Sequence, residues 1–207
     1  IYLFLRAYFY SMIKKHINQN DILNKELLNI IDYNYIFDKK PINRVKAKPT
    51  LENIKNKLEI LKKKIEEITN CELKKNASKI VFSDGNIQSQ IMIIGEGPGQ
   101  KEDEIGKPFV GDAGNLLNKM LKAINIEKDK VYITNVVNYR PPNNRKPEPN
   151  EITRYSKFLK EHISIIDPKI LILMGSTAME ALLGDNKKIS KERGQWKEVI
   201  IKKKNYK

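Results

Sequence analysis

The chain has 207 residues, of which 40% are hydrophobic and 31% are charged, and its formal net charge is +14. These values suit a globular protein with one core-forming domain and an appendage, and the charge favours an anionic partner, first of all nucleic acid. The lysine excess is also what AT-rich coding produces without selection for binding. The single cysteine, Cys71, excludes an internal disulfide and an all-cysteine metal site, and fits a reducing cytoplasm.

Residues 1–48 are predicted to form a helical extension followed by a basic linker, ahead of a main domain at residues 49–207. The opening run IYLFLRAYFYSMI is too short to span a bilayer, and it lacks the cleavage site of a signal peptide. It is therefore either a buried helix or translated sequence upstream of a start at Met12. Helical apolar spacing continues to about Asp38, and DKKPINRVKAKPT has the prolines and charges of a linker.

The main domain begins with an amphipathic helix predicted over residues 51–69, whose lysine-rich face is expected to be solvated. Its predicted apolar face consists of Leu51, Ile54, Leu58, Leu61, Ile65 and Ile68. Strands are predicted at Lys79–Phe82, Gln90–Ile94, Val131–Asn135 and Lys169–Met174, with helices at Ala113–Ala123 and Asn150–Ile165. Short apolar strands separated by helices predict an α/β fold, a three-layer α/β/α sandwich with a central parallel sheet. The loops after Ile94, Asn135 and Met174 should meet at one edge of that sheet, where ligands bind in such folds.

The first of these loops lies in IMIIGEGPGQKEDEIGKPFVGDAG, residues 91–114. Gly95, Gly97 and Gly99 allow backbone N–H groups to approach a bulky or anionic group. The run has Gln100 where a dinucleotide fingerprint needs glycine, and it has no G-K-S or G-K-T. A nucleotide-cofactor protein is therefore one alternative, which tight binding of a free mononucleotide would favour. A plain strand-to-loop turn is another.

Aromatic and amide side chains follow in the same loops. Phe109 is either a core residue or a rigid aromatic platform on which a planar base can stack. Asn135 stands at a predicted strand end, where its amide can donate and accept hydrogen bonds at once, as reading a base edge requires. Arg140 and Arg145 bracket two prolines and are suited to binding phosphate. RGQW is a further basic turn and contains Trp196. The two histidines, His16 and His162, are expected to be solvated or internally satisfied and not metal ligands.

Taken together, GEGPGQKEDEIGKPFVGDAGNLL, VYITNVVNYRPPNNRKPEPNE, DPKILILMGSTAMEALLG and RGQW resemble the family 4 uracil-DNA glycosylases. CELKKNASKIVFSDGN, upstream of these segments, also matches that family. The resemblance extends from about Ile68 to Trp196, in the order and spacing of the family. Related segments also occur in proteins labelled as phage-type DNA polymerases.

The resemblance implies a DNA-repair hydrolase that flips uracil out of DNA and hydrolyses its N-glycosidic bond, leaving an abasic site. Phe109 would stack on the uracil, and Asn135 would hydrogen-bond its polar edge. Glu96 and the Gly97–Gly99 backbone would lie beside the sugar and help position the attacking water. The implied sites are uracil-binding Gly95, Gly97, Phe109 and Asn135, catalytic Glu96, Gly97 and Asn135, and DNA-binding Gly99, Arg140, Arg145 and Arg193.

The sequence departs from the family pattern in two places. The family's [4Fe–4S] cluster uses four cysteines, and the matching positions here are Ile68, Cys71, Tyr139 and Tyr155. Because a cluster needs its thiolates, we expect no cofactor and no metal, and Cys71 to be a small buried apolar residue.

The second departure is at the C-terminal side, where the family continues into a strand and an H-P-x-x-L-L loop whose histidine donates to the departing uracil. No histidine follows His162 in this sequence, so we expect a truncated glycosylase, weakened or inactive. The alternative is a non-catalytic nucleic-acid-binding remnant, which Asn135→Ala would distinguish. We further expect uracil-containing DNA as the partner, no membrane association, a monomer and a cytoplasmic location.

Overall fold

The computed structural model describes residues 49–184, 188–202 and 204–206, which belong to one compact unit spanning residues 48–207. The predictions made for residues 1–48 lie outside the described residues. In the described part of the chain, no helix has both the length and the apolar character needed to cross a membrane.

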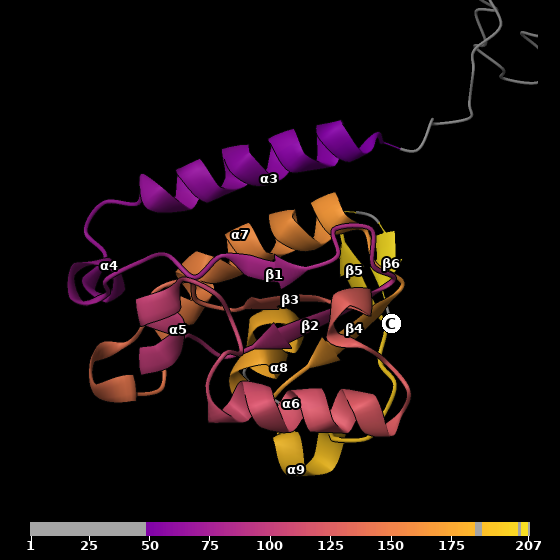
Figure 1. The fold of residues 1–207 in the computed structure, drawn as a ribbon. Helices are drawn as coiled ribbons and strands as arrows, with labels where there is room; N and C mark the ends of the chain where they lie inside the picture. Colours follow the sequence, from indigo (N-terminus) through magenta and orange to yellow (C-terminus); the bar gives the residue numbers. More distant parts are fainter. Residues whose placement is uncertain (1–48, 185–187, 203, 207) are drawn as a thin grey trace, which may run out of the picture. The chain divides into compact units, whose positions relative to one another are not determined.

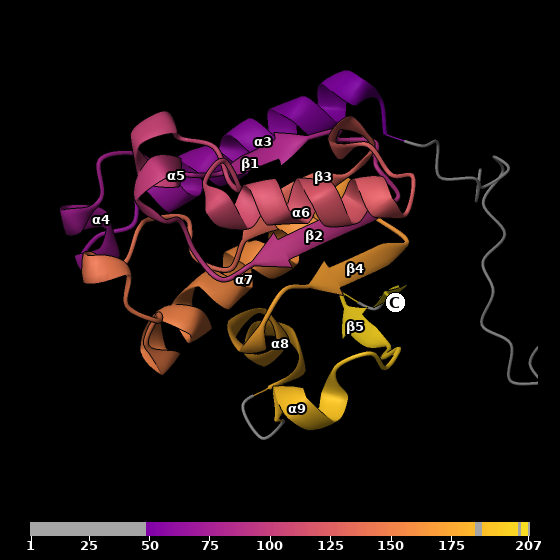
Figure 2. The same cartoon turned by 60° about the horizontal axis from the view of Figure 1, so that its bottom comes forward.

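The centre of the unit is a four-stranded sheet in the order β1-β3-β2-β4. Its strands are β1 (Ser83–Gly85), β2 (Ile91–Gly95), β3 (Tyr132–Asn135) and β4 (Ile170–Leu173). Strands β3, β2 and β4 are parallel, and β1 runs antiparallel along the outer edge of β3. Figure 2 shows the strands side by side, with β4 at the edge opposite β1. The predicted α/β fold is therefore confirmed, with one antiparallel strand added to the parallel set.

Helices cover both faces of this sheet (Figure 1). On one face, α7 (Pro149–Ile166) packs between the sheet and α3 (Leu51–Glu66), and α8 (Ser176–Leu183) contacts α7. On the other face lies α6 (Asp112–Ala123). Because side chains alternate along a strand, Met92 and Ile94 point into the α7 side, whereas Ile93 points toward α6.

The remaining elements are short. They are α4 (Glu72–Asn76), α5 (Gln100–Ile105), α9 (Ile189–Glu192), the 3₁₀ turns η1 (Lys128–Lys130) and η2 (Pro142–Asn144), and the hairpin strands β5 (Val199–Ile201) and β6 (Lys204–Tyr206). The hairpin is attached to the main core: Ile201 and Tyr206 are buried in it, and the Tyr206 hydroxyl donates to Asp167, the residue that ends α7.

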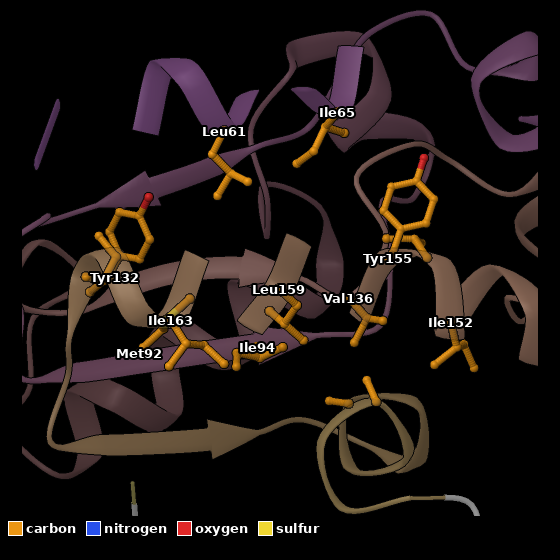
Figure 3. Packing of buried hydrophobic residues seen from close by; sticks show 14 of the residues in the cluster. Leu61, Ile65, Met92, Ile94, Tyr132, Val136, Ile152, Tyr155, Leu159 and Ile163 are labelled. Atoms are coloured by element: carbon orange, nitrogen blue, oxygen red, sulfur yellow. The ribbon is translucent and has the colours of Figure 1, made fainter. Parts of the chain in front are cut away.

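Figure 3 shows the larger core, where α3 and α7 meet the sheet. Four of the six apolar residues predicted for the first helix are buried there: Ile54, Leu58, Leu61 and Ile65. Leu51, the first residue of the helix, is instead exposed, with 46% of its surface accessible to solvent. The helix begins after Thr50, whose hydroxyl accepts a hydrogen bond from the N–H of Asn53, a typical N-cap.

The strand predicted at Lys79–Phe82 is wrong, because the strand begins only at Ser83. The backbone of this segment bonds to side chains and, outside any β-ladder, to one backbone carbonyl, that of Asn138, which accepts from the N–H of Val81 (2.8 Å). The N–H of Lys79 donates to Asp103, and the amide of Asn138 donates to the carbonyl of Val81. Val81 itself is fully buried, so its apolar character reflects the core and not a strand.

His162 lies inside the larger core, as predicted for an internally satisfied histidine. Its ring stacks on Phe82 with centroids 4.6 Å apart, and its Nε2 lies 2.8 Å from the hydroxyl of Tyr132. Complete burial lowers the pKa of His162 to about 3, so the ring is neutral at neutral pH. It is 2% exposed and is therefore not available to a ligand at the surface.

Candidate functional site

The candidate site begins where two parallel strands end side by side. Gly95 is the last residue of β2 and Asn135 the last of β3, and the two are directly opposite in the strand register. The N–H of Val136 donates to the carbonyl of Gly95 (2.9 Å), which continues the ladder one step past the strands. The carboxyl ends of parallel strands are where α/β folds bind ligands, so the predicted meeting of the two loops is confirmed.

The ring of Phe109 and the amide of Asn135 converge on Gly95. A Cβ atom at Gly95 would lie 2.4 Å from Oδ1 of Asn135 and 2.7 Å from the Cε2 and Cζ atoms of Phe109. Any other residue at position 95 would therefore push the two side chains out of place. The glycine is explained by this close approach and not by an unusual backbone angle.

Asn135 is unusual among the buried polar residues. It is only 3% exposed, yet its side-chain amide forms no hydrogen bond to any residue in the described part of the chain. Neither polar atom of this amide is fully shielded from solvent. Asn138, three residues later, is also buried, but its amide donates to the Val81 carbonyl. The amide of Asn135 therefore differs from that of Asn138 in being free to hydrogen-bond a group that reaches it from solvent.

Phe109 has a left-handed backbone, with φ of 54°, which is uncommon for a large side chain. Two neighbours hold it in that conformation. Its carbonyl oxygen lies so close to Gly114 that a Cβ there would be 1.9 Å away. The next two backbone N–H groups, of Val110 and Gly111, both donate to the carboxylate of Glu102, at 2.9 and 2.7 Å.

The loops after β2 and β4 are also tied to each other. The hydroxyl of Thr177, at the start of α8, donates to the carboxylate of Glu96. Thr177 is fully buried, so this bond holds Glu96 toward the interior side of the loop. Gly97 packs against Val137, since a Cβ on Gly97 would lie 2.7 Å from the Cγ2 of Val137.

The three residues predicted to contact DNA in these loops differ in their surroundings. Arg140 donates through Nε to Asn144 (2.8 Å), and no carboxylate in the described residues pairs with it. Arg145 is bound through both Nη atoms to Glu151 (2.8 and 2.7 Å). The N–H of Gly99 donates to Glu102 (3.2 Å). Of these three residues, Arg140 is therefore the one whose charge has no carboxylate partner among the described residues.

The Arg145–Glu151 pair belongs to the start of α7. Glu151 also accepts a hydrogen bond from the N–H of Glu148, the residue that caps the helix. Although burial acts to raise the pKa of Glu151, the hydrogen bonds from Arg145 and from the Glu148 backbone lower that pKa below its usual value. The guanidinium thus stabilises a helix terminus in addition to any contact with phosphate.

Arg193 lies in a different surface feature. It follows α9 and lines an apolar groove of about 520 Å³ that runs along β4, together with Trp196 and Met179. Trp196 is 72% exposed. The residues that line this groove do not include Gly95, Phe109 or Asn135, so the structure does not bring Arg193 into the arrangement at the strand ends.

The four positions matched to the metal cluster, Ile68, Cys71, Tyr139 and Tyr155, all belong to the larger core. Cys71 is buried, and its Sγ lies 3.4 Å from the hydroxyl of Tyr155. Burial raises the pKa of both tyrosines, that of Tyr139 to about 12. Cys71 is thus buried as predicted. In the described residues, no three His, Cys, Asp or Glu side chains are arranged to hold a metal ion.

Comparison with known proteins identifies the family of this chain. Residues 82–205 match the family model described as the uracil DNA glycosylase superfamily. The chain belongs to this superfamily. It is 42% identical to the type-4 uracil-DNA glycosylase of Thermotoga maritima over 133 residues, which cover 64% of this chain and 69% of that protein. It is also 42% identical to the type-4 enzyme of Sulfurisphaera tokodaii over 156 residues, 70% of this chain and 71% of that protein.

The expected similarity to a phage polymerase is also found. A DNA polymerase of Bacillus phage SP01 is 34% identical over 128 residues, which cover 61% of this chain and 14% of the polymerase. The matched region is therefore a small part of a much larger protein there.

Sequence reasoning missed two residues that organise the site, Glu102 and Thr177. The signal for Glu102 was present: it stands three residues after Gly99, the spacing of a capping box at the start of a helix. Thr177 gave no such signal, since threonine at the start of a helix is common and only the fold brings it to Glu96.

Proposed function

We propose that this chain is a DNA glycosylase that binds uracil flipped out of DNA between Phe109 and Asn135 and hydrolyses its N-glycosidic bond. The observation that carries this proposal is the side-chain amide of Asn135, which has no partner among the described residues and faces an aromatic ring across Gly95. A planar ligand with hydrogen-bonding groups on its edge satisfies both at once, because the ring offers a stacking surface and the amide donates and accepts.

The reaction proposed for the site is a displacement at the sugar. The bond between C1′ and N1 of uracil breaks, its electron pair leaves with the base, and a water oxygen bonds to C1′ and loses a proton. Uracil departs as an anion and takes up a proton. Charge builds up on the sugar and on the base, so groups fixed beside each of them lower the barrier.

The residues of this chain divide that work by position. Asn135 would hydrogen-bond the base and stabilise its negative charge, and Phe109 would hold the ring. Glu96, anchored by Thr177, would orient the attacking water, with the backbone at Gly97 close to the sugar. Arg140 would bind a backbone phosphate. Gly99 and Arg145 already bind Glu102 and Glu151, so a contact of either residue with DNA would use atoms outside these bonds or would replace the bonds. Arg193 would contact DNA from the groove along β4.

The residues at the cluster positions do not fit a [4Fe–4S] group. One thiol stands where four are needed, and the hydroxyl of Tyr155 and the ring of Tyr139 take the buried volume around it. We therefore propose that this chain folds without the cluster, and no step of the reaction uses it. The monomeric state and the cytoplasmic location stay predictions.

The test is release of uracil from a single-stranded oligonucleotide that carries one deoxyuridine, followed by alkali cleavage of the abasic product. We expect release by the unaltered chain and loss of release in Asn135→Ala, with matched thermal unfolding of the two proteins as the control for folding. Because the Asn135 amide has no hydrogen-bond partner within the part of the chain that the structure describes, its removal should leave stability nearly unchanged.

A folded chain that releases no uracil but binds undamaged DNA with a strong salt dependence would instead show the alternative, a non-catalytic nucleic-acid-binding remnant. In that case Asn135→Ala should not alter binding.

A further inference from the structure

We propose that Glu102 is a positioning residue, which fixes the backbone that carries Phe109 and so sets the stacking surface opposite Asn135. This inference rests on the proposed function, because it specifies how the same site is built. Glu102 lies in the first turn of α5, is 9% exposed, and its carboxylate binds three backbone N–H groups.

The two carboxylate oxygens bind different segments. Oε1 accepts from Val110 (2.9 Å) and Gly111 (2.7 Å), whereas Oε2 accepts from Gly99 (3.2 Å). A bond to Gly99 alone would suffice for capping α5. The two additional bonds join the glycine loop that follows β2 to the segment that begins with Phe109. Charged acceptors form the stronger backbone hydrogen bonds, so this carboxylate is a firm link between the two.

These bonds act where the backbone is least favourable. Phe109 has its left-handed φ of 54°, and the N–H groups bound by Glu102 are those of the two residues that follow it. Such backbone conformations persist only when several surrounding contacts hold them in place, and they are frequent at ligand sites. On the other side, the Phe109 carbonyl lies against Gly114. The ring is therefore held against Gly95 by its backbone, from both directions.

The position of the carboxylate adds a second effect. Gly111 is the residue before α6, a helix of twelve residues, and a negative charge at a helix N-terminus is favourable. Glu102 thus fixes the start of α6 together with the loop. Loss of the carboxylate should release Phe109, Val110 and Gly111 as one segment.

Asp103 provides a matched control on the same helix. It is 3% exposed, and its carboxylate accepts from the backbone N–H groups of Ser78 (2.9 and 3.1 Å) and Lys79 (3.1 Å). It is therefore an equally buried carboxylate that binds backbone, but it binds a segment that does not carry the stacking ring. Asp103→Asn should reduce stability without changing the Phe109 segment.

The experiment compares Glu102→Ala, Glu102→Gln and Asp103→Asn with the unaltered chain in three measurements. The first is amide hydrogen exchange of Val110 and Gly111. The second is the preference in binding for an oligonucleotide that carries 2′-fluoro-2′-deoxyuridine over one that carries thymidine. The fluorinated nucleotide resists cleavage because fluorine disfavours positive charge on the sugar. The third is kcat/KM for uracil release.

In Glu102→Ala we expect faster exchange at Val110 and Gly111, loss of the preference for the fluorouridine strand, and about 100-fold lower kcat/KM, the cost of misplacing a site group by about 1 Å. In Glu102→Gln the amide oxygen can replace Oε1 and keep the bonds to Val110 and Gly111, so most of the preference should return. If Glu102→Ala does not fold, Glu102→Gln carries the test, because a neutral amide binds backbone N–H groups more weakly than a carboxylate does. Val110 and Gly111 should then still exchange faster than in the unaltered chain, and unchanged exchange would overturn the proposal.

Unchanged exchange at Val110 and Gly111 in both Glu102 variants would overturn the proposal. So would an Asp103→Asn protein with the same loss of strand preference, since the effect would then be a general loss of stability. If the unaltered chain neither releases uracil nor prefers the fluorouridine strand, the proposed function fails, and the exchange data still decide whether Glu102 holds the segment.

Discussion

Two buried regions of this molecule contain polar side chains, and they are built in opposite ways. At the ends of β2 and β3, the side-chain amide of Asn135 has no hydrogen-bond partner among the described residues, and it lies beside a glycine that leaves room for it. Around Cys71, in the larger core, the thiol lies 3.4 Å from the hydroxyl of Tyr155, and large aromatic rings occupy the volume. The first region has an amide that can bond a group from solvent, whereas the second is filled by side chains of the chain itself.

The two regions differ in what fills them. The strand ends combine a glycine, an aromatic ring and a side-chain amide that has no partner among the described residues. The positions matched to the metal cluster lie in or against the larger core, where Tyr155 packs and its hydroxyl lies 3.4 Å from the Sγ of Cys71. Substitutions should therefore act mainly on activity in the first region and mainly on stability in the second.

The largest effect is expected from Tyr155→Ala. This side chain is fully buried and lies near Phe158, with ring centroids 6.3 Å apart. Its removal leaves a cavity, so we expect the free energy of unfolding to fall by about 3–5 kcal/mol, as for other large aromatic residues. Chemical denaturation measures this value. An equally large loss of uracil release per folded molecule would show that the two regions are coupled.

Gly95→Ala tests the strand ends without removing any polar group. The added methyl carbon would clash with Oδ1 of Asn135 and the ring of Phe109, so both must shift. We expect kcat/KM for uracil release to fall about 100-fold, equivalent to about 2.7 kcal/mol. Stability should fall by less than in Tyr155→Ala. Full activity in this variant would mean that the Phe109–Asn135 arrangement is not the base site.

A third prediction concerns pH and the core alone. The pKa of His162 is about 3 in the folded chain and about 6.5 when unfolded. As the pH falls, His162 therefore takes up a proton in the unfolded chain before it does so in the folded chain. Its contribution to the free energy of unfolding is complete above pH 6.5 and is lost as the pH falls toward 3. Between pH 6.5 and pH 5 this amounts to about 2 kcal/mol. Urea unfolding at several pH values should show the slope in the unaltered chain and a shallower one in His162→Gln.

The smallest effect is expected from the two arginines beside the site. Arg140→Gln should lower the salt dependence of DNA binding by about one phosphate contact, because its charge is not paired with a described carboxylate. Arg145→Gln should mainly weaken the start of α7, where the residue binds Glu151. Binding titrations over a range of salt concentrations separate the two, and equal slopes for both variants would contradict the assignment.

The sequence was sufficient to predict the type and position of the helices and strands in which apolar residues recur at a regular spacing. The helix predicted at Asn150–Ile165 is α7 at Pro149–Ile166, and the strand predicted at Val131–Asn135 is β3 at Tyr132–Asn135. The meeting of the two loops followed from these strands, because the ends of neighbouring parallel strands lie together and Gly95 and Asn135 are both strand ends.

Other features were beyond sequence reasoning for physical reasons. The sequence around α5 is typical of a loop, because glycines flank this short helix. Gly99 precedes it, and Gly106 ends it in a left-handed conformation. The ion pair that engages Arg145 depends on a partner six residues away, on a helix whose orientation only the fold fixes. The unpartnered state of Asn135 is likewise a property of its surroundings and not of its residue type.

The burial of Cys71 also gives the protein a built-in chemical reporter. It is the single thiol in the chain and is 6% exposed in the folded state. Thiol reagents should modify it only when the core between α3 and α7 opens, because only an accessible thiolate reacts. The rate of modification in native buffer then measures how often that core opens, without any introduced label. Binding of DNA at the ends of β2 and β3 should leave that rate unchanged if the two regions are independent.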